Sequence, residues 1–99
     1  MPVMDITVIP AGHPSPSVSK VVREVLKILD EMKVKYQLTP MSTAVEGDLN
    51  TLLEVIKRVH NLPFEMGYPR VVTIVKIDER KDKELTLDGK IKSVKEGRS

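Results

Sequence analysis

The chain has 99 residues, 40% of them hydrophobic and 30% charged, which suits one domain with a single core over residues 1–99. Sixteen basic and fourteen acidic residues are interspersed, and aromatic residues make up only 3% of the chain. This composition argues against a nucleic-acid partner, because it offers neither a basic stripe nor stacking platforms. The lack of cysteine excludes disulfides, thiolate nucleophiles and cysteine-based metal sites. No apolar run approaches the roughly 20 residues of a membrane span, and we expect a cytoplasmic protein without a membrane partner.

The first third of the chain predicts a strand, a loop and a helix. Residues 3–9 are rich in β-branched side chains that alternate between two faces, as in a strand. Residues 10–16 contain three prolines and a glycine, which predict a loop. Apolar residues at helical spacing predict a helix with one buried stripe over 18–32, and Ser15 or Ser17 can cap it.

A hairpin and a second helix are predicted next. Residues 33–38 alternate lysine or glutamine with apolar residues, which predicts a half-exposed strand at a sheet edge. The tetrad Thr39-Pro40-Met41-Ser42 has proline where type I and II turns favour it, so 42–46 should return as an antiparallel strand. Asp48 is a plausible N-cap for a helix that ends near Met66-Gly67.

The last third predicts a strand and a charged extension. Residues 70–77 are apolar on both faces, which predicts a strand covered on both sides. Residues 78–84 alternate in charge sign and should form an exposed segment. Apolar residues at i, i+4 and i+7 from Leu87 predict a short C-terminal helix behind an Asp88-Gly89 start.

The predicted order β-α-β-β-α-β is that of the ferredoxin-like fold, in the α+β class. In this fold two helices cover one face of an antiparallel four-stranded sheet, and residues 78–99 would form a C-terminal extension of the same domain. The other face of the sheet would carry aliphatic residues. A contiguous exposed patch of this kind favours self-association through the sheet face or a strand edge, as a homodimer or homotetramer.

Polar residues around the predicted turn are the main candidates for a binding site. Thr39, Thr43 and Glu46 place hydroxyls and a carboxylate among apolar strand residues, where polar groups are costly unless something pairs with them. Their partner is either the protein itself or a ligand in a mostly apolar pocket with a few polar anchors.

Other chemistry-bearing residues favour structural roles. His60 lies on the apolar face of the second helix, which indicates a packed, hydrogen-bonded histidine. The acidic residues of 78–84 are interleaved with lysine and arginine, so salt bridges are favoured over a cation site and no metal is expected. A small hydrolase or isomerase using Glu46 and His13 lacks a second oriented acid–base partner, so we expect no catalytic residues and no enzyme activity.

Short segments spread over nearly the whole chain share their order and spacing with one known family. They are Val8-Ile9-Pro10 with Gly12 and Ser17-Val18-Ser19; Lys35-Tyr36-Gln37-Leu38-Thr39-Pro40-Met41 with Thr43 and Glu46-Gly47; Arg70-Val71-Val72-Thr73 with Ile77-Asp78-Glu79-Arg80; and Gly89-Lys90-Ile91-Lys92-Ser93-Val94. With these segments the chain resembles the YkoF-like thiamine-binding protein family.

The resemblance implies a ferredoxin-like subunit, commonly assembled as a dimer of dimers, that binds thiamine or its hydroxymethylpyrimidine moiety without transforming it. An aminopyrimidine offers an exocyclic amine and ring nitrogens, with which Glu46, Thr39 and Thr43 would pair. Met41 would cover the ring, and Ser17 completes the candidate ligand-binding residues.

Two functions therefore remain open. The first is a non-catalytic binding protein for thiamine or hydroxymethylpyrimidine, with no catalytic cofactor. The second is a structural or regulatory homo-oligomer without a specific small ligand, in which the polar cluster forms internal bonds. Ser42 stands where many relatives of this family have glycine, and this departure bears on the turn and on the width of the pocket.

Overall fold

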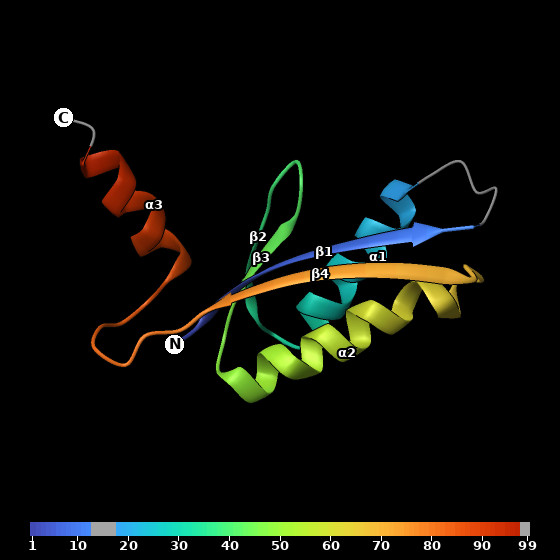
Figure 1. Ribbon diagram of the computed structural model, residues 1–99, viewed down its shortest axis with the longest axis horizontal. Helices are drawn as coiled ribbons and strands as arrows, with labels where there is room; N and C mark the ends of the chain where they lie inside the picture. The colour runs from blue at the N-terminus through green and yellow to red at the C-terminus, as the bar shows by residue number, and fades with distance from the viewer. Residues whose placement is uncertain (13–17, 98–99) are drawn as a thin grey trace.

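The computed structural model describes residues 1–12 and 18–97 (Figure 1). Its elements are β1 (Val3–Ala11), α1 (Val18–Glu31), β2 (Lys35–Leu38), β3 (Thr43–Glu46), α2 (Leu49–Glu65), β4 (Arg70–Asp78) and α3 (Leu87–Glu96). The strands form one antiparallel sheet in the order β2-β3-β1-β4. The predicted α+β, ferredoxin-like order with an added C-terminal helix is confirmed. Within the described ranges, no helix combines the length and the apolar character that crossing a bilayer requires.

The central strand β1 is paired unequally with its two neighbours. It pairs with β4 along its whole length, from Val3 opposite Asp78 to Ala11 opposite Arg70. Its pairing with β3 ends at Ile6, so the second half of β1 has a neighbour on one side only. Proline has no N–H and is tolerated in a strand where one side is unpaired. The prediction that Pro10 begins a loop was therefore wrong, because β1 continues through it.

The core lies between the sheet and helices α1 and α2, which cover the same face (Figure 1). Because strand side chains alternate between faces, the inward residues of β1 and β3 meet the apolar stripes of both helices. The buried cluster comprises Met4, Ile6, Val21, Val25, Leu29, Val45, Leu52, Val55, Val59, Leu62 and Tyr68. His60 of α2 packs at the margin of this core. Its Nδ1 lies 2.6 Å from Thr73 Oγ1 and its ring meets Phe64 edge-on, so the predicted packed histidine is confirmed.

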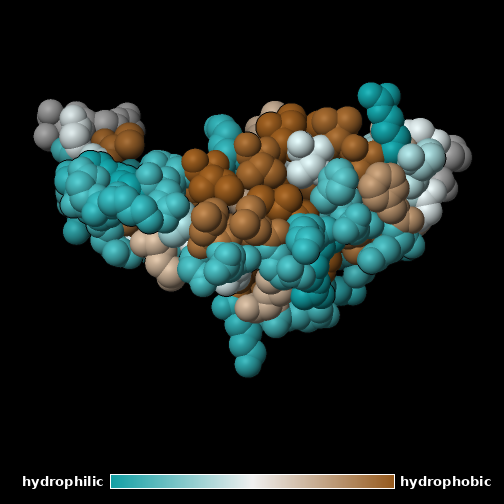
Figure 2. Space-filling view, turned by 60° about the horizontal axis from the view of Figure 1, so that its bottom comes forward, coloured by the Kyte–Doolittle hydropathy of each residue, from teal (hydrophilic) through white to brown (hydrophobic). Residues whose placement is uncertain are grey.

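The opposite face of the sheet is open within the single chain. Ile9 of β1 and Val72 and Ile74 of β4 point to this side and are 44%, 38% and 54% exposed. The predicted cover on both faces of 70–77 is therefore missing in one subunit. Hydrophobic side chains also form a contiguous area on one side of the molecule, flanked by hydrophilic surface (Figure 2).

Helix α3 extends away from the body of the domain (Figure 1) and is anchored at its first turn, where Leu87 is buried and two polar contacts form. The N–H of Leu87 donates to Glu46 Oε1 at 2.9 Å, and Lys35 Nζ lies 2.6 Å from Asp88 Oδ2. The hydrogen bond to Asp88 raises the pKa of Lys35. The helix begins at Leu87, slightly before the predicted Asp88-Gly89 start, because the Thr86 hydroxyl accepts a hydrogen bond from the N–H of Gly89 and caps it.

Helix α2 begins as predicted, with Asp48 as its N-cap. The carboxylate accepts a hydrogen bond from the N–H of Thr51 at 2.7 Å, which satisfies a donor that has no partner inside the helix. Hydrogen bonding to the side chain of Thr51, and then to its N–H, holds the pKa of Asp48 below its usual range. Before the helix, residues 39–42 reverse the chain as predicted. The N–H of Thr39 donates to the carbonyl of Ser42, and the N–H of Ser42 donates to the Thr39 hydroxyl.

Replacing Asp48 by alanine should lower the thermal midpoint by several degrees near neutral pH, since the first turn of α2 loses its side-chain acceptor. The pKa of Asp48 is depressed in the folded state, so its contribution is present above the ordinary aspartate pKa of about 3.9. That contribution is lost as the pH falls through the lower folded-state value. Thermal unfolding followed by circular dichroism should therefore show the two midpoints converging in acid.

The matched control for this prediction is Asp48→Asn, which keeps an acceptor oxygen without the charge. This variant should retain most of the neutral-pH midpoint and show no convergence that depends on this carboxyl. Equal midpoints of wild type and Asp48→Ala at neutral pH would contradict the capping role.

Candidate functional site

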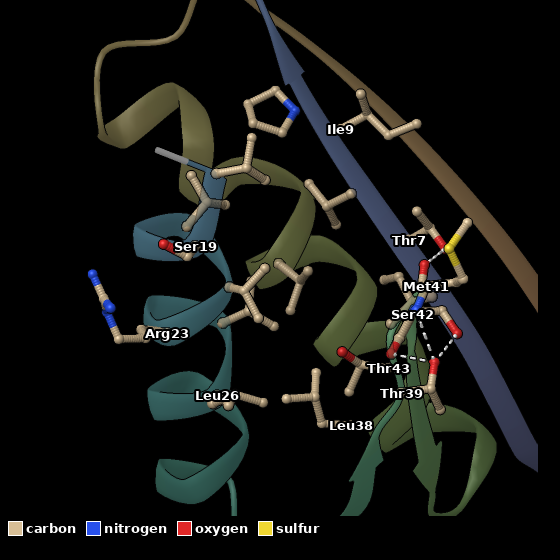
Figure 3. A pocket seen from close by; sticks show the side chains of 18 of the residues that line it. Thr7, Ile9, Ser19, Arg23, Leu26, Leu38, Thr39, Met41, Ser42 and Thr43 are labelled. Atoms are coloured by element: carbon tan, nitrogen blue, oxygen red, sulfur yellow. Dashed lines mark hydrogen bonds between the residues drawn. The ribbon is translucent and has the colours of Figure 1, made fainter. Parts of the chain in front are cut away.

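A pocket of about 580 Å³ lies where β3 stops short of the second half of β1. Helix α1 forms one wall, residues 6–10 of β1 form a second, and the turn 39–42 with the adjoining strand ends forms the third (Figure 3). This volume lies within the range of about 300–1,000 Å³ that small-molecule sites occupy. The unequal pairing of β1 therefore positions a cavity of the right size for a small ligand.

The walls of the pocket are mainly aliphatic. The apolar side chains that line it include Val8, Val22, Leu26, Leu38 and Met41. On α1 they follow a second stripe, one position beyond the buried core stripe of Val21 and Val25, so the helix serves the core and the pocket with adjacent faces. Met41 is 83% exposed and sits at the tip of the turn, where its carbonyl accepts a hydrogen bond from Thr7 Oγ1.

The hydroxyl of Thr39 is used by the turn itself. It donates to the carbonyl of Ser42 at 3.0 Å and accepts from the N–H groups of Ser42 at 3.0 Å and Met41 at 3.3 Å. It also lies 3.2 Å from the Ser42 hydroxyl. A hydroxyl has one donor and two acceptor positions, so these bonds leave Thr39 little capacity for a ligand. Thr39 lines the pocket, but its polar group holds the turn in shape.

The hydroxyl of Thr43 behaves differently. Thr43 is only 6% exposed, yet its side chain forms no hydrogen bond with any residue of the described ranges. Among the described residues, every fully buried side-chain oxygen has a hydrogen-bond partner. The Thr43 oxygen, which has none, is therefore accessible from the pocket. In Figure 3 the Thr43 side chain points across the pocket toward α1. A deep polar group that faces an apolar cavity is suited to anchor a ligand.

Glu46 does not lie in the pocket with Thr39 and Thr43. It is three residues after Thr43 on a strand, and this odd spacing puts the two side chains on opposite faces, about 10 Å apart along the chain. Its carboxylate accepts a hydrogen bond from the N–H of Leu87 and thereby holds α3. The alternation of side chains along a strand could have shown from the sequence that Glu46 does not share a face with Thr43. Ser17 and His13 fall outside the described residues.

The wall that α1 contributes to the pocket was missed from the sequence, including its polar residues Ser19 and Arg23. Arg23 is the only charged residue among the described residues that line the pocket, and its exposed guanidinium lies at the outer side of α1 (Figure 3). Their position beside the aliphatic stripe of α1 could have indicated from the sequence that they border the pocket. Among the residues that the structure describes, no group of acidic or histidine side chains is placed to hold a metal ion.

The different roles of the two threonines predict that only the substitution of Thr39 lowers the stability of the fold. Thr39→Val removes the hydroxyl that closes the turn and should lower the free energy of unfolding by about 1–2 kcal/mol. Thr43→Val removes a hydroxyl that has no partner among the described residues and should leave the free energy of unfolding unchanged or raise it. Urea denaturation of both variants beside wild type measures the difference. Equal destabilisation by the two substitutions would mean that the Thr43 hydroxyl is bonded within the folded protein.

The comparisons with known proteins agree with this fold. A family model described as "Thiamine-binding protein" matches residues 4–95. The UPF0045 protein YqgV of Bacillus subtilis is 50% identical over 98 residues, covering 95% of this chain and 94% of the relative. A Staphylococcus xylosus UPF0045 protein is 46% identical, covering 95% of this chain and 92% of its own.

Solved structures show the same architecture. The hypothetical protein MJ1052 of Methanocaldococcus jannaschii superposes with a TM-score of 0.86 at 37% identity, covering 96% of each chain. A domain of unknown function, DUF77, of Bacillus cereus superposes with a TM-score of 0.81 at 30% identity, covering 91% of this chain and 86% of that one. With a family model that spans nearly all of its length and relatives of this similarity, the chain belongs to the thiamine-binding protein family.

Proposed function

We propose that the protein binds a small pyrimidine, thiamine or its hydroxymethylpyrimidine moiety, in the pocket between α1, β1 and the turn 39–42. The observation that carries this proposal is the Thr43 hydroxyl, 6% exposed, without a partner among the described residues, and directed into an apolar cavity of about 580 Å³. The family description as thiamine-binding supports the choice of ligand class.

The proposed contacts follow from the chemistry of an aminopyrimidine. Its ring nitrogens accept hydrogen bonds and its exocyclic amine donates them, and the Thr43 hydroxyl does both. Leu38 and Leu26 offer aliphatic surface on the walls, and Met41 offers a flexible thioether at the mouth. Thr39 contributes by fixing the turn that presents these side chains. Glu46 has no contact in this proposal.

We propose binding without chemical transformation. Acid–base catalysis needs a titratable group within hydrogen-bond reach of the ligand. The described residues that line the pocket are apolar or hydroxyl-bearing apart from Arg23, and none of them is a carboxylate or a histidine. Of the two groups considered for catalysis, Glu46 accepts a hydrogen bond from the N–H of Leu87, and His13 falls outside the described residues.

We also propose that the chain self-associates through the open face of the sheet, as a homodimer or homotetramer. Ile9, Val72 and Ile74 expose aliphatic surface there, and burying it against a second copy removes that surface from water. This observation also favours the second candidate function, a structural or regulatory homo-oligomer. The two functions are compatible in one molecule, because the pocket opens on the helix side of the sheet and the aliphatic residues lie on the other.

Binding is tested by isothermal titration calorimetry with hydroxymethylpyrimidine and with thiamine. Thr43→Val should weaken binding by about tenfold or more, since the buried polar atoms of the ligand lose their partner. The control is Glu46→Gln, which keeps an acceptor for the N–H of Leu87 and should leave affinity unchanged. The proposal fails if neither ligand binds at millimolar concentration, or if Glu46→Gln abolishes binding while Thr43→Val does not.

Self-association is tested by sedimentation velocity at micromolar concentration. Ile74→Lys places a charge on the open sheet face and should shift the protein toward the monomer. Leu53→Lys changes another exposed aliphatic residue, 45% exposed against 54% for Ile74, on α2 and should leave the distribution unchanged. A wild-type protein that sediments only as a monomer would rule out the association, and equal effects of both variants would place it elsewhere.

A further inference from the structure

We infer that the main chain of Val8 is a second recognition point of the pocket, where its N–H and its carbonyl hold the amine edge of an aminopyrimidine. The inference rests on the proposed function and specifies how the same site recognises its ligand class. It follows from the pairing of β1, which leaves Val8 without a strand partner on the side of the pocket.

The direction of the main-chain groups along β1 follows from the start of its pairing with β3. In an antiparallel sheet, the N–H and the carbonyl of one residue point to the same neighbouring strand, and those of the next residue point to the other. The N–H of Gly47 donates to the carbonyl of Pro2 at 3.3 Å, one position before the paired register begins. The even-numbered residues of β1 therefore face the β3 side. Pro10 has the same parity, which agrees with its lack of an N–H on the unpaired side.

Val8 is the even-numbered residue at which β3 is missing. The pairing with β3 ends at Ile6, and a continued register would place Met41 opposite Val8. The turn draws Met41 out of the sheet, because its N–H donates to Thr39 Oγ1 at 3.3 Å and its carbonyl accepts from Thr7 Oγ1 at 3.4 Å. Within the described ranges, no main-chain hydrogen bond joins Val8 to this turn. Both main-chain groups of Val8 are therefore open on this side.

The pocket borders the edge of β1 where these groups point. Residues 6–10 all line the pocket, although side chains alternate between the two faces of a sheet. The Ile9 side chain lies on the far side of β1 from α1 (Figure 3), so the lining follows the edge of the strand. Pro10 has no N–H, so the open edge offers one complete pair of donor and acceptor. One pair suits a single heteroaromatic ring, whereas a peptide strand pairs through several residues.

A buried aminopyrimidine needs more polar partners than the pocket side chains supply. Its two ring nitrogens accept hydrogen bonds, its amine donates them, and a buried polar group without a partner costs affinity. The Thr43 hydroxyl can donate to only one ring nitrogen. Interactions within the protein already engage the other hydroxyl-bearing residues of the lining, Thr7, Ser19, Thr39 and Ser42. The second ring nitrogen and the amine therefore call for the donor and the acceptor that Val8 provides.

The main chain of Val8 matches the amine edge of the ring. In this ligand the amine lies beside a ring nitrogen, so a donor and an acceptor are adjacent, as they are on a strand residue. The N–H of Val8 donates to that ring nitrogen, and the carbonyl accepts from the amine. Thr43 pairs in register with Ile6, which is two residues or about 7 Å from Val8 along β1. A substituted pyrimidine spans this separation, so Thr43 can donate to the other ring nitrogen.

The test is amide hydrogen exchange of the full chain followed by NMR, without ligand and with saturating hydroxymethylpyrimidine. In the free protein the amide of Val8 should exchange about tenfold or more faster than those of Thr7 and Ile9, which face β4. Saturation should slow the exchange of Val8 toward that of its neighbours, since the N–H gains an acceptor. An amide of Val8 that is already protected without ligand, or whose exchange does not change on saturation, would overturn the inference.

Two variants and one ligand analogue test the same contact by calorimetric titration. Val8→Pro removes the N–H on the side that Pro10 already tolerates, and its affinity for hydroxymethylpyrimidine should fall by about tenfold or more. Val8→Ala keeps the N–H and is the matched control, which should lose much less affinity. An analogue without the exocyclic amine should bind wild type about tenfold or more weakly than hydroxymethylpyrimidine, because the carbonyl of Val8 loses its donor.

The outcomes separate this inference from the proposed function. Equal losses in Val8→Pro and Val8→Ala, or equal affinity for the analogue without the amine, would overturn the inference while leaving the proposed function intact. Exchange at Val8 is measured on the wild-type chain, so it decides whether or not Val8→Pro folds. Failure of hydroxymethylpyrimidine and thiamine to bind wild type would overturn the proposed function and this inference with it.

Discussion

The pairing of β1 is the constraint on which the rest of this structure depends. One neighbour, β4, follows β1 over nine residue pairs, while the other, β3, follows it over four. Beyond Ile6, no strand lies between the second half of β1 and α1. The pocket occupies this position, and α1 and the turn 39–42 form its walls. Pro10 fits this geometry because the unpaired side of β1 requires no N–H. The cavity is thus a consequence of how short β3 is.

The two threonines on either side of this turn show how one residue type serves two purposes. Thr39 directs its hydroxyl to the backbone of the turn and is saturated there. Thr43 directs its hydroxyl into the cavity, where desolvation without a partner is unfavourable. A fold optimised only for stability would place valine at Thr43, because valine has nearly the same shape and no polar atom to satisfy. A threonine at this position is consistent with selection for a ligand contact.

Sequence periodicity predicted the elements and their order, because helical and strand spacing are local properties. The cap at Asp48 and the packed His60 were predicted for the same reason. The extent of strand pairing is not local, so Pro10 was assigned to a loop. Glu46 was grouped with Thr43 from closeness in sequence, although three residues along a strand reverse the face. Arg23 drew no attention because an exposed arginine on an amphipathic helix is ordinary until the opposite wall of the pocket is known.

Strand β3 contributes side chains to both faces of the sheet. Its inward residues, Thr43 and Val45, serve the pocket and the core, and its outward residue Glu46 holds α3. Helix α3 therefore lies at one end of the open sheet face, where Lys90 and Asp78 form a third polar contact at 2.6 Å. The exposed aliphatic residues of β1 and β4 occupy the same face. Because ligand contacts and the proposed subunit contacts use side chains of opposite parity on the same strands, substitutions on one face should leave the other function largely unaffected.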